Sequence, residues 1–304
     1  MPAAVREAVE RRLGSDVVEA STQSGGFSPG VAARLRLRDG RRVFVKAVSS
    51  DPNPNSPGMH RREARIAAAL PATVPTPRFL FLHDDGEWVA LAFEDVDGRM
   101  PVTPWQAQEL ELVLSAVTRM ATSLTPSPIS LATIAEVDDD DFRGWRRLLT
   151  AAATGVDHLA GLDPWAQRNL EALAELEARW PQGAEGTTLL HVDLRADNML
   201  ITEDRVVVVD WPHAAIGAAW IDLMFLLPSV AMQGGPMPWE LFDSHPVAKD
   251  ADPERVNAVL AAIAGFFIGQ SRQPPPPGLP TLRQFQRDQG LPALAWLKRR
   301  TGWK

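Results

Sequence analysis

The spacing of apolar residues in the first hundred positions predicts two helices and five strands. Apolar residues that recur every four positions place residues 2–13 on a helix, with Val5, Val9 and Leu13 on one face. Short apolar or alternating runs predict strands at 17–20, 31–38, 42–48, 78–83 and 87–93. Two turn signals join four of these strands into hairpins, Asp39-Gly40 and Asp84-Asp85-Gly86. A helix over about residues 59–70 is expected to cross the resulting sheet.

The pattern changes after Phe93, where the apolar strand gives way to the polar stretch Glu94-Asp-Val-Asp-Gly98. Val206–Val209 predicts one more strand, because four adjacent valines are typical of a strand buried on both faces. Most other later segments have helical spacing, namely about 104–124, the residues after 138–141, 164–180, 218–232 and 253–270, followed by short closing helices. We therefore predict an α+β fold, with a small β-rich N-terminal lobe over 1–93 and a larger, mainly helical C-terminal lobe over 94–304.

Composition and charge narrow the choice of partners. The chain has 304 residues, of which 45% are hydrophobic and 23% charged, as in ordinary globular proteins. A net charge of −7 argues against nucleic acid or an anionic membrane as a partner and mildly favours a cationic substrate. The absence of cysteine excludes disulfides and thiolate catalysis and fits a reducing compartment. The first residues lack a signal-peptide pattern, and the most apolar segment, 259–268, covers about half a membrane span, so we expect a cytoplasmic protein.

Polar residues suited to chemistry gather in the stretch HVDLRADNML and after the valine run. His191, Asp193 and Asn198 lie in this stretch, and Asp210 directly follows Val209. An ionised carboxylate at the tip of a buried strand is costly unless a positive group lies beside it, and a divalent metal that carries a nucleotide would supply that charge. In a phosphoryl transfer, Asp193 suits the acceptor of the hydroxyl proton, while Asn198 and Asp210 suit Mg²⁺, which prefers oxygen ligands.

Two earlier segments suit the phosphate groups of such a nucleotide. Lys46 lies among apolar residues on the strand over 42–48, and Glu63 falls on the apolar arc of the helix over 59–70, so the two could form an ion pair. The alternatives are a solvated edge-strand lysine and a glutamate that pairs with nearby arginines. The loop over 24–30 could bring its backbone close to phosphates, because glycine carries no Cβ.

The order of these elements resembles a known family. The pattern His191-x-Asp193-x-x-x-x-Asn198 followed by Asp210 is similar to the catalytic segment of the protein-kinase-like fold, and within that fold it most resembles the aminoglycoside phosphotransferase family of small-molecule kinases. The other elements of that family occur in its order, namely the hairpin with Lys46, the helix with Glu63 and the strand-to-linker step at Phe93-Glu94. The resemblance extends from about residue 17 to about residue 235, and it implies two lobes with a nucleotide between them.

The resemblance implies catalytic roles position by position. Asp193 would orient the acceptor hydroxyl as the catalytic base, and Arg195 would lie near the transferring phosphate. Asn198 and Asp210 would ligate Mg²⁺. His191 and Asp222 would have a structural role, in which they fix the catalytic loop.

The resemblance also implies a set of residues that bind the nucleotide, either ATP or GTP. Lys46, oriented by Glu63, would contact the α- and β-phosphates. Backbone groups of the linker after Phe93, around Glu94 to Val96, would hydrogen-bond the adenine base. The phosphates would be covered by the loop residues Ser24, Gly25, Gly26, Phe27 and Ser28, although this loop does not read G-x-G-x-x-G.

The residues after Asp210 indicate the kind of acceptor. Asp210 is followed by Trp211-Pro212 rather than Phe-Gly, only eleven residues separate it from Asp222, and no Ala-Pro-Glu occurs. This leaves no room for a regulated segment that docks a peptide. The predicted acceptor is therefore a hydroxylated small molecule, such as a cationic, aminoglycoside-like antibiotic or a metabolite, and the enzyme would be a monomer or a homodimer.

Two other functions fit parts of the sequence. Gly26-Phe-Ser28-Pro-Gly30 matches the G-x-S-x-G nucleophile elbow of serine hydrolases, but that motif needs a helix after the serine, whereas a strand is predicted at 31–38. The second alternative is a kinase fold that binds a nucleotide without catalysing a transfer.

Overall fold

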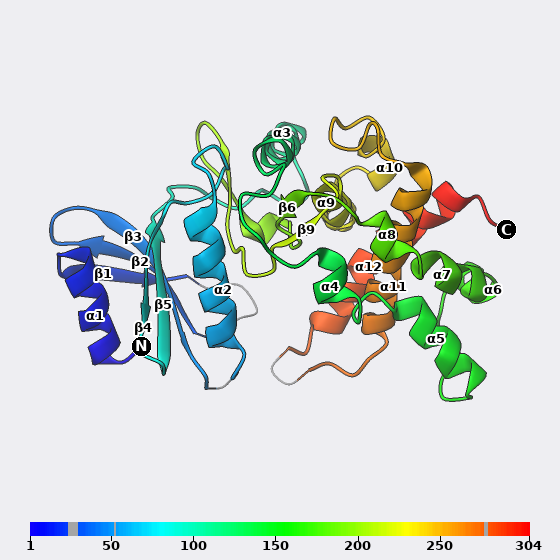
Figure 1. The fold of residues 1–304 in the computed structure, drawn as a ribbon, viewed down its shortest axis with the longest axis horizontal. Coiled ribbons are helices and arrows are strands. Elements are labelled where there is room, and N and C mark those ends of the chain that lie inside the picture. Colours follow the sequence, from blue (N-terminus) through cyan, green and yellow to red (C-terminus); the bar gives the residue numbers. More distant parts are fainter. Residues whose placement is uncertain (24–29, 52, 277–278) are drawn as a thin grey trace. The chain divides into compact units, whose positions relative to one another are not determined.

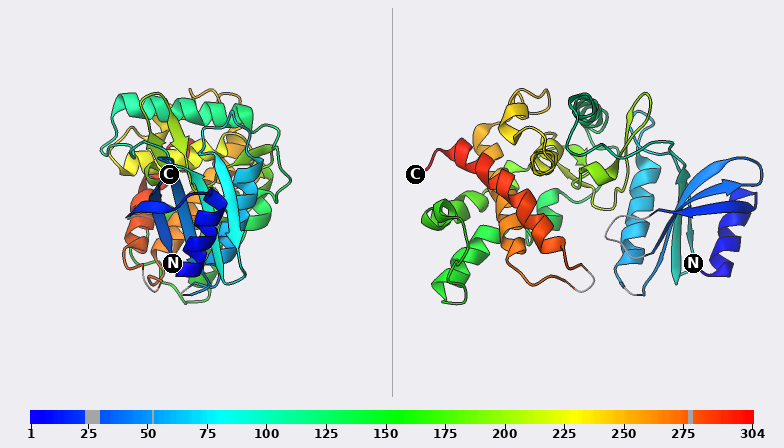
Figure 2. Two further views of the ribbon diagram at one scale, coloured as in Figure 1. Left: turned by 90° about the vertical axis from the view of Figure 1, so that its left-hand side faces the viewer. Right: turned by 180° about the vertical axis from the view of Figure 1, so that it is seen from behind.

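The structure, a computed structural model, describes residues 1–23, 30–51, 53–276 and 279–304. Its contacts divide the chain into two compact units, Met1–Pro101 with Ala196–Ala214, and Val102–Arg195 with Ala215–Lys304. The first unit contains an antiparallel sheet with helices against it, and the second is mainly helical (Figures 1 and 2). The predicted α+β class is confirmed. Within the described ranges, no helix combines the length and the apolar character that crossing a membrane requires.

The sheet of the first unit has five strands in the order β1-β2-β3-β5-β4, and every neighbouring pair is antiparallel. The strands are β1 (Val17–Thr22), β2 (Val31–Leu37), β3 (Arg42–Ser49), β4 (Phe79–Asp84) and β5 (Trp88–Glu94). The five predicted strands and both hairpins are confirmed within one or two residues. β3 lies between β2 and β5, so both of its edges form hydrogen bonds within the sheet.

Each face of this sheet is covered by one helix, α1 (Ala3–Leu13) or α2 (Ser56–Ala69) (Figure 1). The predicted apolar stripe of α1 packs against Val43, Val45 and Ala47 of β3. The opposite face places Phe44 of β3 against Ala64 of α2, together with the alternate residues Val89, Leu91 and Phe93 of β5. Because side chains alternate along a strand, Lys46 belongs to the face that α2 covers.

Residues 196–214 complete the first unit. A short 3₁₀ helix, η1 (Ala196–Asn198), leads into the antiparallel pair β7 (Met199–Ile201) and β8 (Val206–Val208). Arg99 bridges to Ile201, and Val208 N–H donates to the carbonyl oxygen of Pro75, 2.6 Å away. The three valines of β8 are fully buried, as their composition predicted. These bonds attach the segment that carries Asn198 and Asp210 to residues early in the chain.

The second unit consists of helices around one small pair of strands, β6 (Thr188–Leu190) and β9 (Ala215–Gly217). Its helices are α3 (Ala107–Ser123), α4 (Ile134–Asp138), α5 (Gly144–Ala153), α6 (Pro164–Arg168), α7 (Leu170–Glu177), α8 (Trp180–Gly183), α9 (Ile221–Met232), α10 (Pro238–Leu241), α11 (Pro253–Ser271) and α12 (Leu282–Thr301). The helix predicted over 164–180 is three shorter ones, and Pro181, which lacks an N–H, prevents α7 from continuing into α8. The closing segment is one long helix, α12, rather than several short ones.

Two glycines allow α5 and α11 to touch. A Cβ on Gly144 would lie 1.8 Å from the carbonyl oxygen of Gly265, so neither backbone could keep its position. The Glu177 carboxylate, fully buried on α7, accepts hydrogen bonds from the N–H groups of Trp145 and Arg146 at the start of α5. Three helices of the second unit therefore meet around one capped helix start.

Gly144→Ala should destabilise the protein by about 3 kcal/mol, because α5 and α11 must move apart to admit the new methyl group. Urea unfolding measures the change. Gly58→Ala is the control, because a Cβ there meets nothing within 4 Å and alanine favours the helix, so its stability should hold or rise by up to about 1 kcal/mol. Equal stability of Gly144→Ala and the parent would contradict the close approach.

Candidate active site

A buried ion cluster joins three distant parts of the first unit. Lys46 Nζ of β3 lies 2.8 Å from Glu63 Oε1 of α2 and 2.7 Å from Asp210 Oδ1. The Lys46 and Glu63 side chains are 17% and 4% exposed, whereas the Asp210 side chain is 44% exposed. The structure therefore brings together Lys46 and Glu63, as their positions on strand and helix predicted. It also adds a direct contact between Lys46 and Asp210 that sequence reasoning missed.

Burial and charge shift the titration of this cluster. Burial alone would lower the pKa of Lys46, but the attraction of Glu63 and Asp210 together raises it above its ordinary value. Burial raises the pKa of Glu63, and the Lys46 ammonium pulls it back down. Burial and the positive charge of Lys46 lower the pKa of the nearby His60 to about 4, so this imidazole is neutral at neutral pH. Lys46 is therefore a permanent cation in a largely water-free setting, suited to binding an anion.

Helix α2 also fixes the residues that follow Asp210. Glu63 accepts a hydrogen bond from Trp211 N–H, and Arg62 donates to the carbonyl oxygen of Ala214 at 2.8 Å. Trp211 is buried, and its indole N–H donates to Val208. Asp210 has a φ of 70°, a left-handed conformation that few residues other than glycine adopt. These contacts hold the Asp210 backbone in a strained conformation and thereby fix the position of its carboxylate.

Asn198 lies beside the residues that precede Asp210. It ends η1, its side chain is buried, and its carbonyl oxygen accepts a hydrogen bond from Val209 N–H at 3.0 Å. One amide oxygen and one carboxylate fit Mg²⁺, which takes few protein oxygens and completes its shell with water and phosphate oxygens. The described residues contain no cluster of three or more histidine or acidic side chains that could hold a metal unaided.

The linker after β5 begins inside the sheet. Phe93 pairs with Phe44 of β3 and packs edge-on against Phe79 at 5.5 Å. Glu94 ends β5, and its N–H donates to the carbonyl oxygen of Arg78 at 2.9 Å. The segment proposed to bind the base is thus anchored by the two strands that flank β5.

The loop with Asp193 is organised within the second unit by Asp222 of α9. Both oxygens of this buried carboxylate accept backbone N–H groups, from His191 and Val192, at 2.9 Å each. Burial raises the pKa of Asp222 to about 6, although the two N–H donors oppose the shift. Val192 has a φ of 72°, which is rare for a β-branched residue. Asp193 N–H then donates to His191 Nδ1 at 3.2 Å, so the loop has a defined path up to Asp193.

Arg195 lies between Asp193 and an aromatic ring. Its guanidinium is 3.1 Å from Asp193 Oδ1 and stacks over Phe285 of α12, 5.5 Å from the ring centre. Cation–π contact of this kind stabilises an arginine while leaving its edges available. Sequence reasoning missed Phe285, because no local pattern connects it with the HVDLRADNML stretch. The remaining predicted residues, Ser24 to Ser28, lie outside the described residues.

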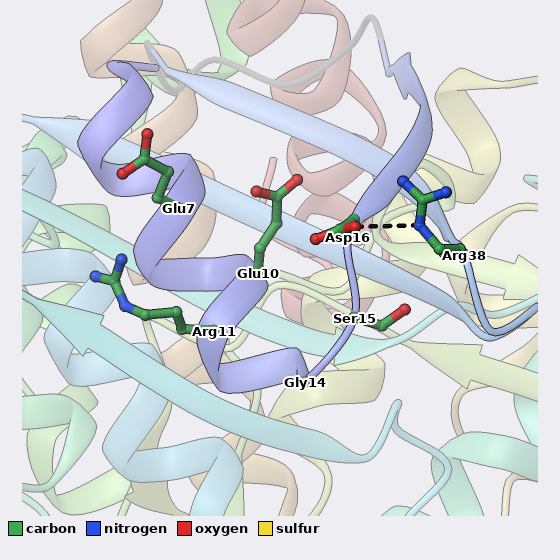
Figure 3. Close-up of a pocket in the computed structure, with 7 residues that line it drawn as sticks. All are labelled: Glu7, Glu10, Arg11, Gly14, Ser15, Asp16 and Arg38. Atoms are coloured by element: carbon green, nitrogen blue, oxygen red, sulfur yellow. Dashed lines mark hydrogen bonds and ion pairs between the residues drawn. The ribbon is translucent and has the colours of Figure 1, made fainter.

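One pocket of the first unit is unrelated to these groups. It has a volume of about 510 Å³ and is lined by Glu7, Glu10, Arg11, Gly14, Ser15, Asp16 and Arg38 (Figure 3). It lies at the end of α1, on the face of the sheet opposite to Lys46. Glu10 accepts a hydrogen bond from Val17 N–H there, and Asp16 pairs with Arg38. The pocket lies away from Lys46 and is no part of the candidate site.

The sheet with its lysine–glutamate pair and the helical unit with its aspartate loop define a kinase-like phosphotransferase. The model of the phosphotransferase enzyme family (APH) matches residues 24–259. Because this match covers most of the chain, the protein belongs to that family. It also excludes the hydrolase alternative, in agreement with the strand β2 that begins at Val31 where a nucleophile elbow would need a helix. Among curated protein sequences, none matches the chain.

Solved structures share the fold at low sequence identity. An aminoglycoside phosphotransferase from Alicyclobacillus acidocaldarius has a TM-score of 0.61 at 15% identity, with 94% of each chain covered. A thermostable mutant of the aminoglycoside phosphotransferase APH(4)-Ia, in complex with AMP-PNP and hygromycin B, has a TM-score of 0.57 at 16% identity, covering 98% of this chain and 96% of that one. A macrolide 2′-phosphotransferase from Brachybacterium faecium has a TM-score of 0.51 at 19% identity, covering 97% and 93%. The predicted protein-kinase-like fold is confirmed.

Lys46→Met should destabilise the protein by about 3–5 kcal/mol at pH 8, because two carboxylates then lack their buried cation. The deficit should shrink as the pH falls. In the variant the pKa of Glu63 is raised by burial without the opposing effect of Lys46, so folding favours the protonated form and stability is lost as the pH rises. Urea unfolding at pH 8 and pH 5 measures both effects. Lys46→Met/Glu63→Gln is the matched control and should recover part of the loss, and a deficit independent of pH would argue against this account.

Asp222→Asn should release the loop before Asp193, because an amide offers a donor where two backbone N–H groups point. Amide hydrogen exchange should lose protection at His191 and Val192 by about tenfold or more. In the parent, the same two amides should lose protection as the pH falls through about 6, where Asp222 becomes protonated. Asp243→Asn, which alters an exposed ion pair with Arg300, should leave both amides unchanged. Protection at these amides that survives Asp222→Asn would refute the assigned role.

Proposed function

We propose that this protein is a small-molecule kinase that transfers the γ-phosphoryl group of ATP to a hydroxyl group of its acceptor. The observation that carries the proposal is the Lys46 ammonium held between Glu63 and Asp210. One carboxylate, that of Glu63, would be enough to neutralise a lysine with a purely structural role. The second carboxylate, that of Asp210, is 44% exposed and has a strained backbone, so it is better suited to binding a cationic ligand than to stabilising the fold. A nucleotide with its metal provides both the anion for Lys46 and the cation for Asp210.

The residues of the chain divide the work of the transfer. Lys46 would neutralise the α- and β-phosphates, and Asn198 and Asp210 would hold Mg²⁺, which supplies charge neutralisation at the phosphate oxygens when bound. Asp193 would orient the acceptor hydroxyl and receive its proton as that oxygen bonds to the γ-phosphorus and the bridging bond to ADP breaks. Arg195, in contact with Asp193, would then stabilise the charge on the transferring group.

The acceptor is proposed to be a hydroxylated small molecule, either an aminoglycoside-like antibiotic or a metabolite, acted on in the cytoplasm. Two of the structurally similar enzymes are an aminoglycoside phosphotransferase and a macrolide 2′-phosphotransferase, which supports an acceptor of this size. The eleven residues between Asp210 and Asp222 support it as well, because a peptide-docking segment would be longer. A monomer or a homodimer would suffice, and the proposal requires neither nucleic acid nor a membrane.

The proposal predicts acceptor-dependent ATP consumption that Asp193→Asn lowers by about 10²–10⁴-fold, because the hydroxyl loses its base. The measurement is a coupled ADP assay over a panel of hydroxylated antibiotics, sugars and amino alcohols. Asp204→Asn, at an exposed turn, is the control and should keep the parent rate. Binding of Mg·ATP without turnover across the panel would instead identify a nucleotide-binding protein without catalysis. Turnover that survives Asp193→Asn would remove Asp193 from the mechanism.

A further inference from the structure

The N-terminal end of α12 is fixed in place by one arginine. Arg283 lies in the first turn of this helix, and its guanidinium donates to Gln270 Oε1 of α11 at 2.9 Å and to Gln286 Oε1 of α12 at 2.8 Å. Its Nε also donates to the carbonyl oxygen of Pro274 at 3.0 Å. Hydrogen bonds from a charged donor are stronger than neutral ones. One side chain therefore ties the start of α12 to the end of α11 and to the connector between them.

The next turns of α12 cannot slide along α11 either. The two helices run side by side (Figures 1 and 2), and they approach closely at Gly290. A Cβ at this glycine would lie 3.0 Å from Cβ of Phe267 and 3.1 Å from Cδ1 of Ile268, closer than side chains normally approach. Phe285 lies between Arg283 and Gly290 in the chain, so the stretch of helix that carries it is held at both ends.

Phe285 uses this fixed position to contact Arg195. The Arg195 guanidinium carbon lies 5.5 Å from the centre of the Phe285 ring, within the range in which the face of an aromatic ring attracts a cation. The Arg195 side chain is only 17% exposed, so water screens this attraction weakly. The same guanidinium lies 3.1 Å from Asp193 Oδ1. Arg195 thus has two supports within the second unit, one ionic and one aromatic.

These two supports respond differently to the proposed transfer. Asp193 would receive the hydroxyl proton while the acceptor oxygen bonds to the γ-phosphorus and the bond to ADP breaks. A carboxylate that gains a proton loses its charge, so its attraction for Arg195 falls just when Arg195 has to stabilise the transferring group. The ring of Phe285 has no ionisable group, so it attracts the guanidinium equally before and after the step.

We propose that Phe285 is a positioning residue for the phosphoryl transfer, whose ring keeps the Arg195 guanidinium in place when Asp193 loses its charge. The inference rests on the proposed function and adds a residue of α12 to it. Phe285 does not have to touch the nucleotide or the acceptor, because it acts through Arg195. Its contribution belongs to kcat rather than to the KM for Mg·ATP, since the groups proposed to bind the nucleotide lie in the first unit.

Fluorinated phenylalanine in place of Phe285 provides the first test, in the coupled ADP assay with an acceptor found in the panel. Fluorine withdraws negative charge from the ring face and leaves the ring almost unchanged in size. The kcat should therefore fall stepwise from the mono- to the trifluorinated ring, to about 3- to 30-fold below the parent value. The KM for Mg·ATP should stay within about twofold of the parent value.

The outcomes of this test separate the two proposals. A ring that serves only packing is insensitive to fluorine, so an unchanged kcat in all three proteins overturns the inference, while turnover by the parent leaves the proposed function in place. A KM for Mg·ATP that rises with fluorination while kcat stays constant also overturns it. Absence of turnover by the parent across the whole panel overturns both proposals.

Natural substitutions provide the second test. Phe285→Leu keeps an apolar side chain but removes the aromatic face, and it should lower kcat by about 3- to 30-fold. Phe285→Tyr retains the ring and should keep the parent rate. Phe267→Leu is the matched control, because it removes a ring from the close contact of α11 with α12 at Gly290. It should lower the urea midpoint and leave kcat unchanged. An equal loss of kcat in both leucine variants would make loosened helix packing the cause and would overturn the inference.

A double-mutant cycle with Arg195→Met tests whether Phe285 acts through the arginine. Once the guanidinium is absent, Phe285→Leu should have no further effect, so Arg195→Met and Arg195→Met/Phe285→Leu should agree in kcat within about twofold. Urea unfolding of the same four proteins should show that the two substitutions are not additive, and it applies even where turnover of Arg195→Met is too slow to measure. The inference fails if Phe285→Leu lowers kcat by the same factor in both backgrounds, or if the two unfolding energies simply add.

Discussion

The buried ammonium of Lys46 is the constraint on which the first unit depends. A cation can be removed from water only if carboxylates replace its hydration, and those carboxylates come from residues 17 and 164 positions later in the chain. Helix α2 must therefore lie against one particular face of the sheet, and the segment after β8 must return to that face. The contacts of Arg62 and Glu63 with residues 211–214 and the bond from Val208 to Pro75 serve the same requirement. The ion cluster that holds this unit together is thus also the group that we propose binds phosphate and metal.

A second constraint of the same kind acts on the aspartate loop, with the opposite sign of charge. Asp222 is a buried anion that contacts no cation among the residues the structure describes, and it is stabilised by two backbone N–H groups instead. The rise in its pKa to about 6 reflects that incomplete compensation. In return, the two bonds hold Val192 in a left-handed conformation that its branched side chain disfavours. The position of Asp193 therefore depends on the buried carboxylate of Asp222, which holds the two residues before it.

The spacing of apolar residues predicted those features that are determined within a single helix or strand. The alternation of β3 placed Lys46 on the α2 face, the helical arc placed Glu63 toward it, and the valine run identified β8. Contacts between distant segments left no such trace. Asp95 reads as one acid in a polar linker, and only the sheet order shows that Arg34 and Arg42 reach it. Phe285 is one aromatic residue among many until α12 brings it under Arg195. The closing segment was predicted as short helices, but α12 is one helix that continues through Pro292, where the following Ala293 and Leu294 are buried.

The division of the chain between Arg195 and Ala196 separates two kinds of recognition within one short motif. Lys46, Asn198, Asp210 and the linker belong to the first unit, where Lys46 pairs with Glu63 and Asp210, and Asp95 of the linker pairs with Arg34 and Arg42. Asp193 and Arg195 belong to the second, where Arg195 rests on a ring of α12. Under the proposed function, nucleotide binding would depend on ion pairs that tolerate little change, because removing one partner leaves a buried charge unpaired. Acceptor binding would depend on helices whose apolar packing admits volume-conserving changes at small cost. The proposal therefore implies that the acceptor can change more readily than the nucleotide.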